Sequence, residues 1–220
     1  DVKVGRGAFM PDLDSARALA ETMIQIGHAV GRRVTAVLSA MDQPLGCAIG
    51  NAVEVAEAIA TLQGHGPRDL VTHCLAIAAE MALLGGVAHD PEQGRALAQK
   101  ALQSGRALEC FARWIAGQGG DVHVVDDPMR LPQAPCRRVT VAPRGGYLAA
   151  LDAREFGLTA VELGAGRERK EQRIDLSVGI VLQRQGGECV TAGEPLWIIY
   201  AASEAAAQAA EVRLLKACAW

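Results

Sequence analysis

The order of elements at the start of the chain restricts its fold most. A glycine-containing loop, DVKVGRGAFM (residues 1–10), precedes an amphipathic helical pattern that ends near Gly31. The β-branched run RVTAVLSA (residues 33–40) follows without polar alternation, which is typical of a buried parallel strand. A second loop, MDQPLGCAIGNA (residues 41–52), then leads to a second helical pattern. This order predicts an α/β sheet with both loops at one edge, as the two lips of a crevice.

The character of the sequence changes in its second half. Residues 67–118 have helical patterns, and the pattern at 69–86 is apolar on most faces, which predicts a deeply buried helix. A polar, proline-containing link follows, and after it short strands alternate with glycine turns before an alanine-rich helical pattern. We therefore predict two domains, residues 1–120 and 137–220, joined by a linker at 121–136.

The composition limits the partners of the chain. Its net charge is −3 and its pI is about 6.0, so the overall charge does not favour binding to nucleic acid or to an anionic membrane. No apolar run approaches the ~20 residues of a membrane span. The six cysteines lie far apart with no C-x-x-C spacing, which predicts reduced, mostly buried thiols in a cytoplasmic protein and argues against zinc.

The second loop has the chemistry of an oxygen-ligand site. Pro44 and Gly46 predict an irregular backbone whose carbonyl groups cannot all enter helical hydrogen bonds. Together with the carboxylate of Glu57, such carbonyls suit a monovalent cation or calcium better than zinc. The alternative is that Glu54 and Glu57 lie on a solvated helix face and that Asn51 caps the helix.

Two other glycine-containing stretches are compatible with ligand binding. In GRGAF (residues 5–9) the missing side chains allow close approach to an anion or a ring, but an ordinary strand-to-helix turn explains the same pattern. The G-x-G-x-x-G spacing of dinucleotide-binding loops is not met. In LGAGRERKEQRIDLSVGI (residues 163–180) a basic cluster follows G-x-G. It would hold phosphate or, because Glu168 and Glu171 are interspersed, form a solvated loop with weak ion pairs.

Three stretches together resemble the C-terminal half of a pyrimidine-nucleoside or thymidine phosphorylase. They are DVKVGRGAFM, MDQPLGCAIGNAVEVAEAI and LGAGRERKEQRIDLSVGI. The resemblance extends over essentially all 220 residues, and it favours the bacterial branch of broad pyrimidine specificity. It implies an α/β fold with a central mixed sheet flanked by helices, as in nucleoside phosphorylases and phosphoribosyltransferases. A small α+β C-terminal domain of the hammerhead type would follow this fold.

The resemblance also implies an activity and a set of site residues. The reaction would be phosphorolysis of uridine, thymidine or deoxyuridine to the free base and ribose or deoxyribose 1-phosphate, with phosphate as co-substrate. Phe9 matches the position that lines the base pocket. The potassium ligands of the family match the backbone carbonyls of Leu45 and Ala48 and the carboxylate of Glu57. No catalytic residue is carried over, because the groups that grip phosphate and pyrimidine would lie upstream of Asp1.

On this resemblance, an N-terminal half would complete the enzyme. The strand that feeds the first loop would belong to that half, and we expect the isolated chain to be inactive. The full enzyme is expected to be a cytoplasmic homodimer without nucleic-acid or membrane partners. The sequence leaves open whether the enzyme uses thymidine alone or several pyrimidine nucleosides.

Two other functions are compatible with the sequence. The stretch VGIVLQRQGGECVTAGEPLWIIYA (residues 178–201) resembles the hammerhead sandwich of biotinyl and lipoyl carrier modules. A carrier needs a lysine on an exposed hairpin, usually beside methionine, and no Met-Lys-Met occurs here. The other alternative is a non-catalytic scaffold that completes an enzyme in trans.

Overall fold

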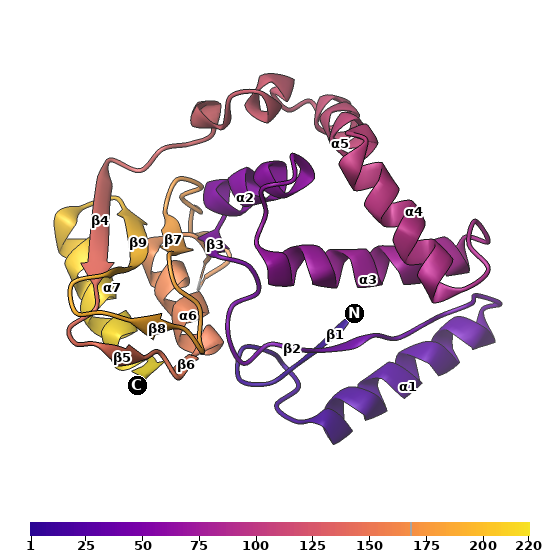
Figure 1. Cartoon of the computed structure of the whole chain (residues 1–220), viewed down its shortest axis with the longest axis horizontal. Helices are drawn as coiled ribbons and strands as arrows, with labels where there is room; N and C mark the ends of the chain where they lie inside the picture. Colours follow the sequence, from indigo (N-terminus) through magenta and orange to yellow (C-terminus); the bar gives the residue numbers. More distant parts are fainter. Residues whose placement is uncertain (168) are drawn as a thin grey trace. The chain divides into compact units, whose positions relative to one another are not determined.

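The computed structural model describes residues 1–167 and 169–220, which form two compact units (Figure 1). The first unit contains Asp1–Met41 and Ala60–Val122, and the second contains Asp42–Ile59 and His123–Trp220. The predicted first domain, residues 1–120, thus includes a segment that the structure groups with the second unit. The physical reason is a short strand in that segment, β3, which pairs with a strand of the second unit.

The first unit combines a strand pair with helices. Its elements are β1 (Val2–Val4), α1 (Leu13–Ala29), β2 (Leu38–Ala40), α3 (Arg68–Leu84), α4 (Pro91–Gln103) and α5 (Arg106–Gly117). A further helix, α2 (Ala52–Leu62), has residues in both units.

The strands β1 and β2 pair in parallel, and α1 runs beside them (Figure 1). Val2 is buried against Ala16 and Ala20 of α1. Two expectations are corrected here. The strand that feeds the first loop was expected to lie upstream of this chain, but residues 2–4 form a strand there. The strand predicted at residues 33–40 is limited to its last three residues.

Helix starts follow the capping residues in the sequence. Asp12 precedes α1, and its carboxylate accepts a hydrogen bond from the Ser15 amide at 2.8 Å. Asp90 precedes α4 and accepts from the Gln93 amide at 2.7 Å, with Pro91 in the first helical position.

Helices α3 and α4 pack closely because one helix carries glycine at the contact. A Cβ atom on Gly94 of α4 would lie 2.7 Å from the carbonyl oxygen of Ala79 on α3.

Only Leu75 and Ala79 of α3 are buried, and the side chain of Met81 is 67% exposed. The expectation of a deeply buried helix at 69–86 is therefore wrong for the chain as described, since α3 packs mainly along the one face that meets α4.

The second unit contains antiparallel sheets, helices of its own and part of α2. Its four-stranded sheet has the order β3 (Ala48–Gly50), β7 (Gly179–Leu182), β9 (Pro195–Ala201) and β4 (Cys136–Val141). Two-stranded sheets join β5 (Gly146–Tyr147) to β8 (Cys189–Val190) and β6 (Ala150–Leu151) to β10 (Cys218–Ala219). The helices are α6 (Ala153–Leu163) and α7 (Glu204–Lys216), and the short 3-10 helices are η1 (Val122–Val125) and η2 (Pro128–Arg130).

The core of the second unit lies between its main sheet and its helices. Phe156 of α6 and Trp197 of β9 are fully buried and meet edge to face, with ring centroids 5.4 Å apart. The coarse α/β prediction is confirmed. In residues 1–167 and 169–220, however, parallel and antiparallel pairs occupy separate sheets and do not share one mixed sheet. The hammerhead arrangement stays a prediction.

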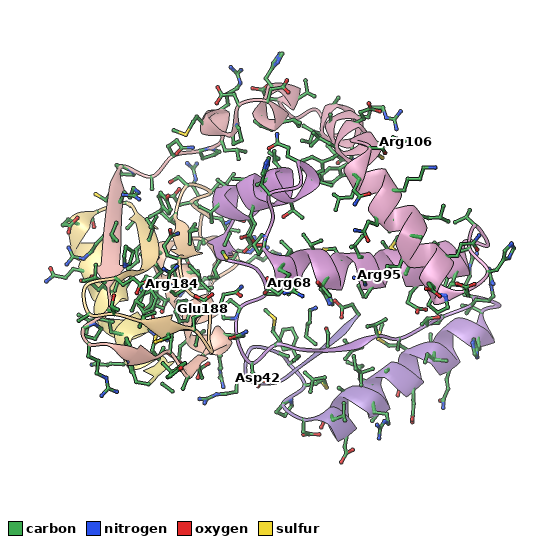
Figure 2. The ribbon with its side chains drawn as sticks, in the orientation of Figure 1. Asp42, Arg68, Arg95, Arg106, Arg184 and Glu188 are labelled. Atoms are coloured by element: carbon green, nitrogen blue, oxygen red, sulfur yellow. The ribbon has the colours of Figure 1, made fainter. Side chains whose placement is uncertain are left out.

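Charged side chains hold the loop that follows β7. Arg184 lies beside Glu188 (Figure 2), with Nε 3.9 Å from Oε2. The same guanidinium donates to Oε1 of Glu194, from Nε at 2.9 Å and also from Nη2. Glu194 Oε2 accepts from the Thr191 amide at 2.8 Å, so one carboxylate ties the loop after β7 to the turn after β8.

The cysteine expectation is corrected in one respect. All six thiols are free, but none of them is buried. Cys74, Cys110 and Cys189 are exposed. Among the helices in the described residues, none is long and apolar enough to span a membrane.

Candidate functional site

The loop between β2 and α2 is shaped by a carboxylate on the helix that follows it. Glu57 of α2 accepts two backbone hydrogen bonds on Oε1, from the Cys47 amide at 2.8 Å and from the Ala48 amide at 3.1 Å. Glu54 accepts from the Gly50 amide at 2.8 Å, and burial raises the pKa of the Glu54 carboxyl. Glu54 is exposed on α2, as the alternative predicted, but both carboxylates also accept hydrogen bonds from the loop backbone.

The backbone of Ala48 faces the side of the loop on which Glu57 lies. Cys47 O accepts from the Leu182 amide at 2.8 Å, so the ladder between β3 and β7 uses Cys47. The neighbouring residue in such a ladder, Ala48, directs its N–H and C=O to the opposite side. The Ala48 amide donates to Glu57 on that side. Within the described ranges, the carbonyl of Leu45 accepts no hydrogen bond.

This arrangement has the donor chemistry of a cation site built largely from backbone oxygens. Pro44 and Gly46 are buried in the loop, and Gly46 adopts a φ of +73°, which favours glycine. Carbonyl oxygens with a single carboxylate suit weakly hydrated or large hard cations. No group of three or more His, Cys, Asp or Glu side chains able to hold a metal occurs among the residues that the structure describes. A cation here would therefore depend on carbonyls.

Asn51 links the same region to a distant loop. Its side-chain amide donates to Ala165 O at 2.7 Å, and the Ala52 amide donates to Leu176 O at 3.0 Å. The start of α2 is thus attached to the loop that follows α6, although more than a hundred residues separate them in sequence. The cap predicted for Asn51 did not anticipate this contact.

The basic part of that loop is solvent-exposed. Arg167, Arg169, Lys170 and Arg173 are exposed, and Arg167 donates to the Lys170 carbonyl at 3.4 Å. Glu168, which the sequence analysis places in this charge pattern, lies outside the described residues. These observations favour the solvated loop over a phosphate site.

The loop after β1 carries Phe9, the residue expected to line a base pocket. Its side chain is 98% exposed. The Gly5 amide donates to Met10 O at 3.0 Å, which closes the loop on itself. The Gly7 amide donates to Met41 O at 2.8 Å, so this loop starts beside the residue that follows β2. Both loops leave one edge of the parallel pair, in agreement with the sequence analysis.

A polar cluster on β1, β2 and α3 was missed by sequence reasoning. Lys3 Nζ lies 2.8 Å from Asp1 Oδ2, 3.0 Å from Ser39 Oγ and 2.8 Å from His73 Nε2. Burial lowers the pKa of the Lys3 ammonium. The alternation of side chains along a strand places Asp1 and Lys3 on one face, but no local signal connects them to His73, seventy residues later.

Two family models match the chain, one in its N-terminal part and one in its C-terminal part. Residues 1–108 match a glycosyl transferase family a/b domain. Residues 147–219 match a pyrimidine nucleoside phosphorylase C-terminal domain. The first match contains the β1 and β2 loops, and the second contains most of the second unit.

Two curated proteins match the chain over most of its length. A pyrimidine-nucleoside phosphorylase of Geobacillus stearothermophilus is 48% identical over 204 residues, which are 93% of this chain and 47% of that protein. A protein of the same name from Staphylococcus aureus (strain USA300) is 48% identical over 200 residues, which are 91% of this chain and 46% of that protein. The chain thus spans about half the length of the curated relatives it matches.

Proposed function

Because this chain belongs to the pyrimidine-nucleoside phosphorylase family, we propose that it forms part of an enzyme that transfers a pentosyl group from a pyrimidine nucleoside to phosphate. The observation that carries the proposal is the 48% identity over 93% of the chain, together with two family models in sequence. Uridine, thymidine and deoxyuridine are the proposed substrates. The products are the free base and ribose or deoxyribose 1-phosphate.

The chemistry sets what such a site must provide. The bond between C1′ and the base nitrogen breaks, the base leaves with the electron pair, and a phosphate oxygen bonds to C1′. Positive charge develops on the sugar and negative charge on the base, so rate depends on positioning and electrostatic stabilisation. Phe9 is the residue of this chain proposed to face the base. Its exposure leaves the ring accessible to a planar ligand.

Potassium is the proposed cation of the loop before α2. Its ligands in this chain would be the carbonyls of Leu45 and Ala48 and the carboxylate of Glu57. The fit is supported by the direction of the Ala48 backbone, whose amide meets Glu57 on the side away from β7. When bound, the ion supplies positive charge that keeps these oxygens together. The carboxylate itself orders the loop by accepting from Cys47 and Ala48.

The proposed partner is the family's N-terminal half, which would carry the phosphate-binding and most of the pyrimidine-binding groups. The chain matches only 47% of its Geobacillus relative, and this observation supports the proposal. The complete enzyme is proposed to be a cytoplasmic homodimer that uses phosphate and a pyrimidine nucleoside and has no nucleic-acid or membrane partner. The isolated chain is proposed to be inactive.

A chimera tests this function. These 220 residues replace the aligned segment of the Geobacillus protein, and uridine cleavage is followed by ultraviolet absorbance with and without phosphate. We expect phosphate-dependent cleavage by the chimera and none by the isolated 220-residue chain. Cleavage that does not need phosphate, or no cleavage by a chimera with a cooperative thermal transition, would overturn the proposal.

A further inference from the structure

We propose that Lys3 and His73 are positioning residues that couple proton uptake to the placement of the Phe9 loop. The biological role of this coupling rests on the proposed function: if Phe9 faces the base, the coupling makes nucleoside binding depend on pH. Its physical content concerns this chain alone, so it can be measured without catalysis.

The brace, which we define as Asp1, Lys3, Ser39 and His73, uses every donor of one ammonium group. Lys3 Nζ has three N–H bonds, and its three neighbours are Asp1 Oδ2 at 2.8 Å, Ser39 Oγ at 3.0 Å and His73 Nε2 at 2.8 Å. Ser39 Oγ also donates to Asp1 Oδ1 at 2.8 Å. The brace therefore joins β1, β2 and α3 through side chains.

The brace lies on the face of the strand pair that α1 does not cover. Val2 packs against α1, and successive side chains of a strand point to opposite faces. Asp1 and Lys3 therefore point to the other face, where His73 of α3 meets them. Charged groups in this position are partly shielded from water, which strengthens their mutual effects.

His73 cannot satisfy both of its neighbours at once. Its Nε2 lies 2.8 Å from Lys3 Nζ and 2.9 Å from Asp1 Oδ2. An unprotonated Nε2 accepts from Lys3, whereas a protonated Nε2 donates to Asp1 and meets the ammonium as a like charge. When the neutral ring carries its proton on Nδ1, proton uptake at Nε2 replaces the hydrogen bond from Lys3 by one to Asp1 and repels the Lys3 ammonium.

The groups around His73 favour its neutral form near pH 7. Burial, followed by the charge of Lys3, lowers the pKa of His73 below its usual 6.5. The Asp1 carboxylate faces the same ring nitrogen and opposes this effect. Two further titratable residues lie near His73 along α3: Asp69, one turn earlier, and Cys74, the next residue. Burial raises the pKa of the Cys74 thiol, which keeps it uncharged.

Only two residues connect Lys3 to the backbone hydrogen bond that closes the Phe9 loop. Lys3 is followed by Val4 and then by Gly5, whose amide donates to Met10 O and closes the loop. Ser39 acts on the same loop from the other strand, because the Gly7 amide donates to Met41 O two residues after Ser39. A displaced brace therefore changes where Phe9 is held.

Fluorine NMR of the isolated chain tests the coupling. The chain has three phenylalanines, so 4-fluorophenylalanine gives three signals, and Phe9→Leu assigns one of them. We expect the Phe9 signal to shift between pH 8 and about 5 with the midpoint of the His73 ring titration. In His73→Gln, which donates and accepts without titrating, the Phe9 signal should not depend on pH. The Phe111 signal serves as the check that the first unit remains folded.

Lys3→Met provides the second arm. It removes the like charge, so the His73 midpoint should rise, whereas the exposed control Lys100→Met should leave it unchanged.

The inference is overturned if the Phe9 signal keeps its pH dependence in His73→Gln, or if it is constant while His73 titrates. In the chimera, the nucleoside KM should rise on acidification in the parent but not in His73→Gln, with kcat changed little. An inactive chimera would refute the proposed function and leave the NMR result to decide the coupling.

Discussion

Glu57 Oε1 accepts a hydrogen bond from the Cys47 amide at 2.8 Å, across ten residues of sequence. The same oxygen accepts from Ala48, so one carboxylate on α2 fixes the turn that precedes β3. A carboxylate that receives two amide N–H groups is both a structural anchor and a fixed negative charge. The loop is therefore ordered by the same group that is proposed to bind the cation.

Replacement of Glu57 by Gln separates these two roles. Gln keeps an acceptor oxygen for the loop amides but removes the charge that attracts a cation. In the active chimera we expect the potassium concentration for half-maximal activation to rise about tenfold, or about 1.4 kcal/mol. The measurement is a potassium titration of uridine cleavage in a tetraalkylammonium background.

Glu54→Gln is the matched control, because Glu54 also accepts a loop amide from α2 but is not a proposed ligand. Its potassium dependence should equal that of the parent. Equal potassium titrations for the Glu57 variant and the parent would contradict the ligand assignment.

Replacement of Phe9 by Ala should affect binding and not folding. Because the ring is 98% exposed, its loss removes no packing within this chain, and the thermal midpoint should not change. Loss of an apolar wall beside the base should raise the nucleoside KM of the chimera about tenfold and the phosphate KM much less. The check is a pair of KM determinations in which each substrate is varied separately. Equal increases in both constants would remove Phe9 from the base site.

The carboxylate of Glu194 should make the stability of the chain depend on pH. The Thr191 amide, and then the Arg184 guanidinium, lower the pKa of Glu194 below its usual 4.5. A carboxyl with a lowered folded-state pKa contributes stability above its unfolded value and loses it as the pH falls through the folded value. Glu194→Gln should therefore melt at a lower temperature than the parent at pH 7, and the gap should shrink below pH 4.5.

Glu188→Gln is the control for this measurement. Its carboxylate lies 3.9 Å from Arg184 Nε, farther than Glu194, so its effect on the melting temperature should be smaller. A Glu194→Gln gap that is constant between pH 7 and pH 3 would contradict the assignment.

Local features were the most predictable from sequence. The caps at Asp12 and Asp90 depend on local sequence alone, because each is formed by a side chain and an amide three residues away. Strand β3 was read as loop, because three residues in a glycine-rich stretch carry no periodicity. Its partner β7 lies about 130 residues later, so only tertiary pairing makes it a strand.

In the candidate site, too, some features follow from local sequence and others only from packing. The role of Glu57 as an oxygen ligand stays a prediction from the sequence. Its hydrogen bonds from Cys47 and Ala48 could not be predicted, since they depend on how α2 packs against the loop. The contact between Lys3 and His73 joins separate elements, and no spacing in the sequence encodes it. The burial of 69–86 was overestimated because apolar composition does not say how many faces a helix will pack.

The identity of the sugar product tests the central claim most directly. Phosphorus NMR of the chimera incubated with uridine and phosphate should show a ribose 1-phosphate signal that grows in equal amount with uracil. Uracil without a new phosphate ester would mean hydrolysis, and it would contradict the assignment of this chain to a phosphorolytic enzyme.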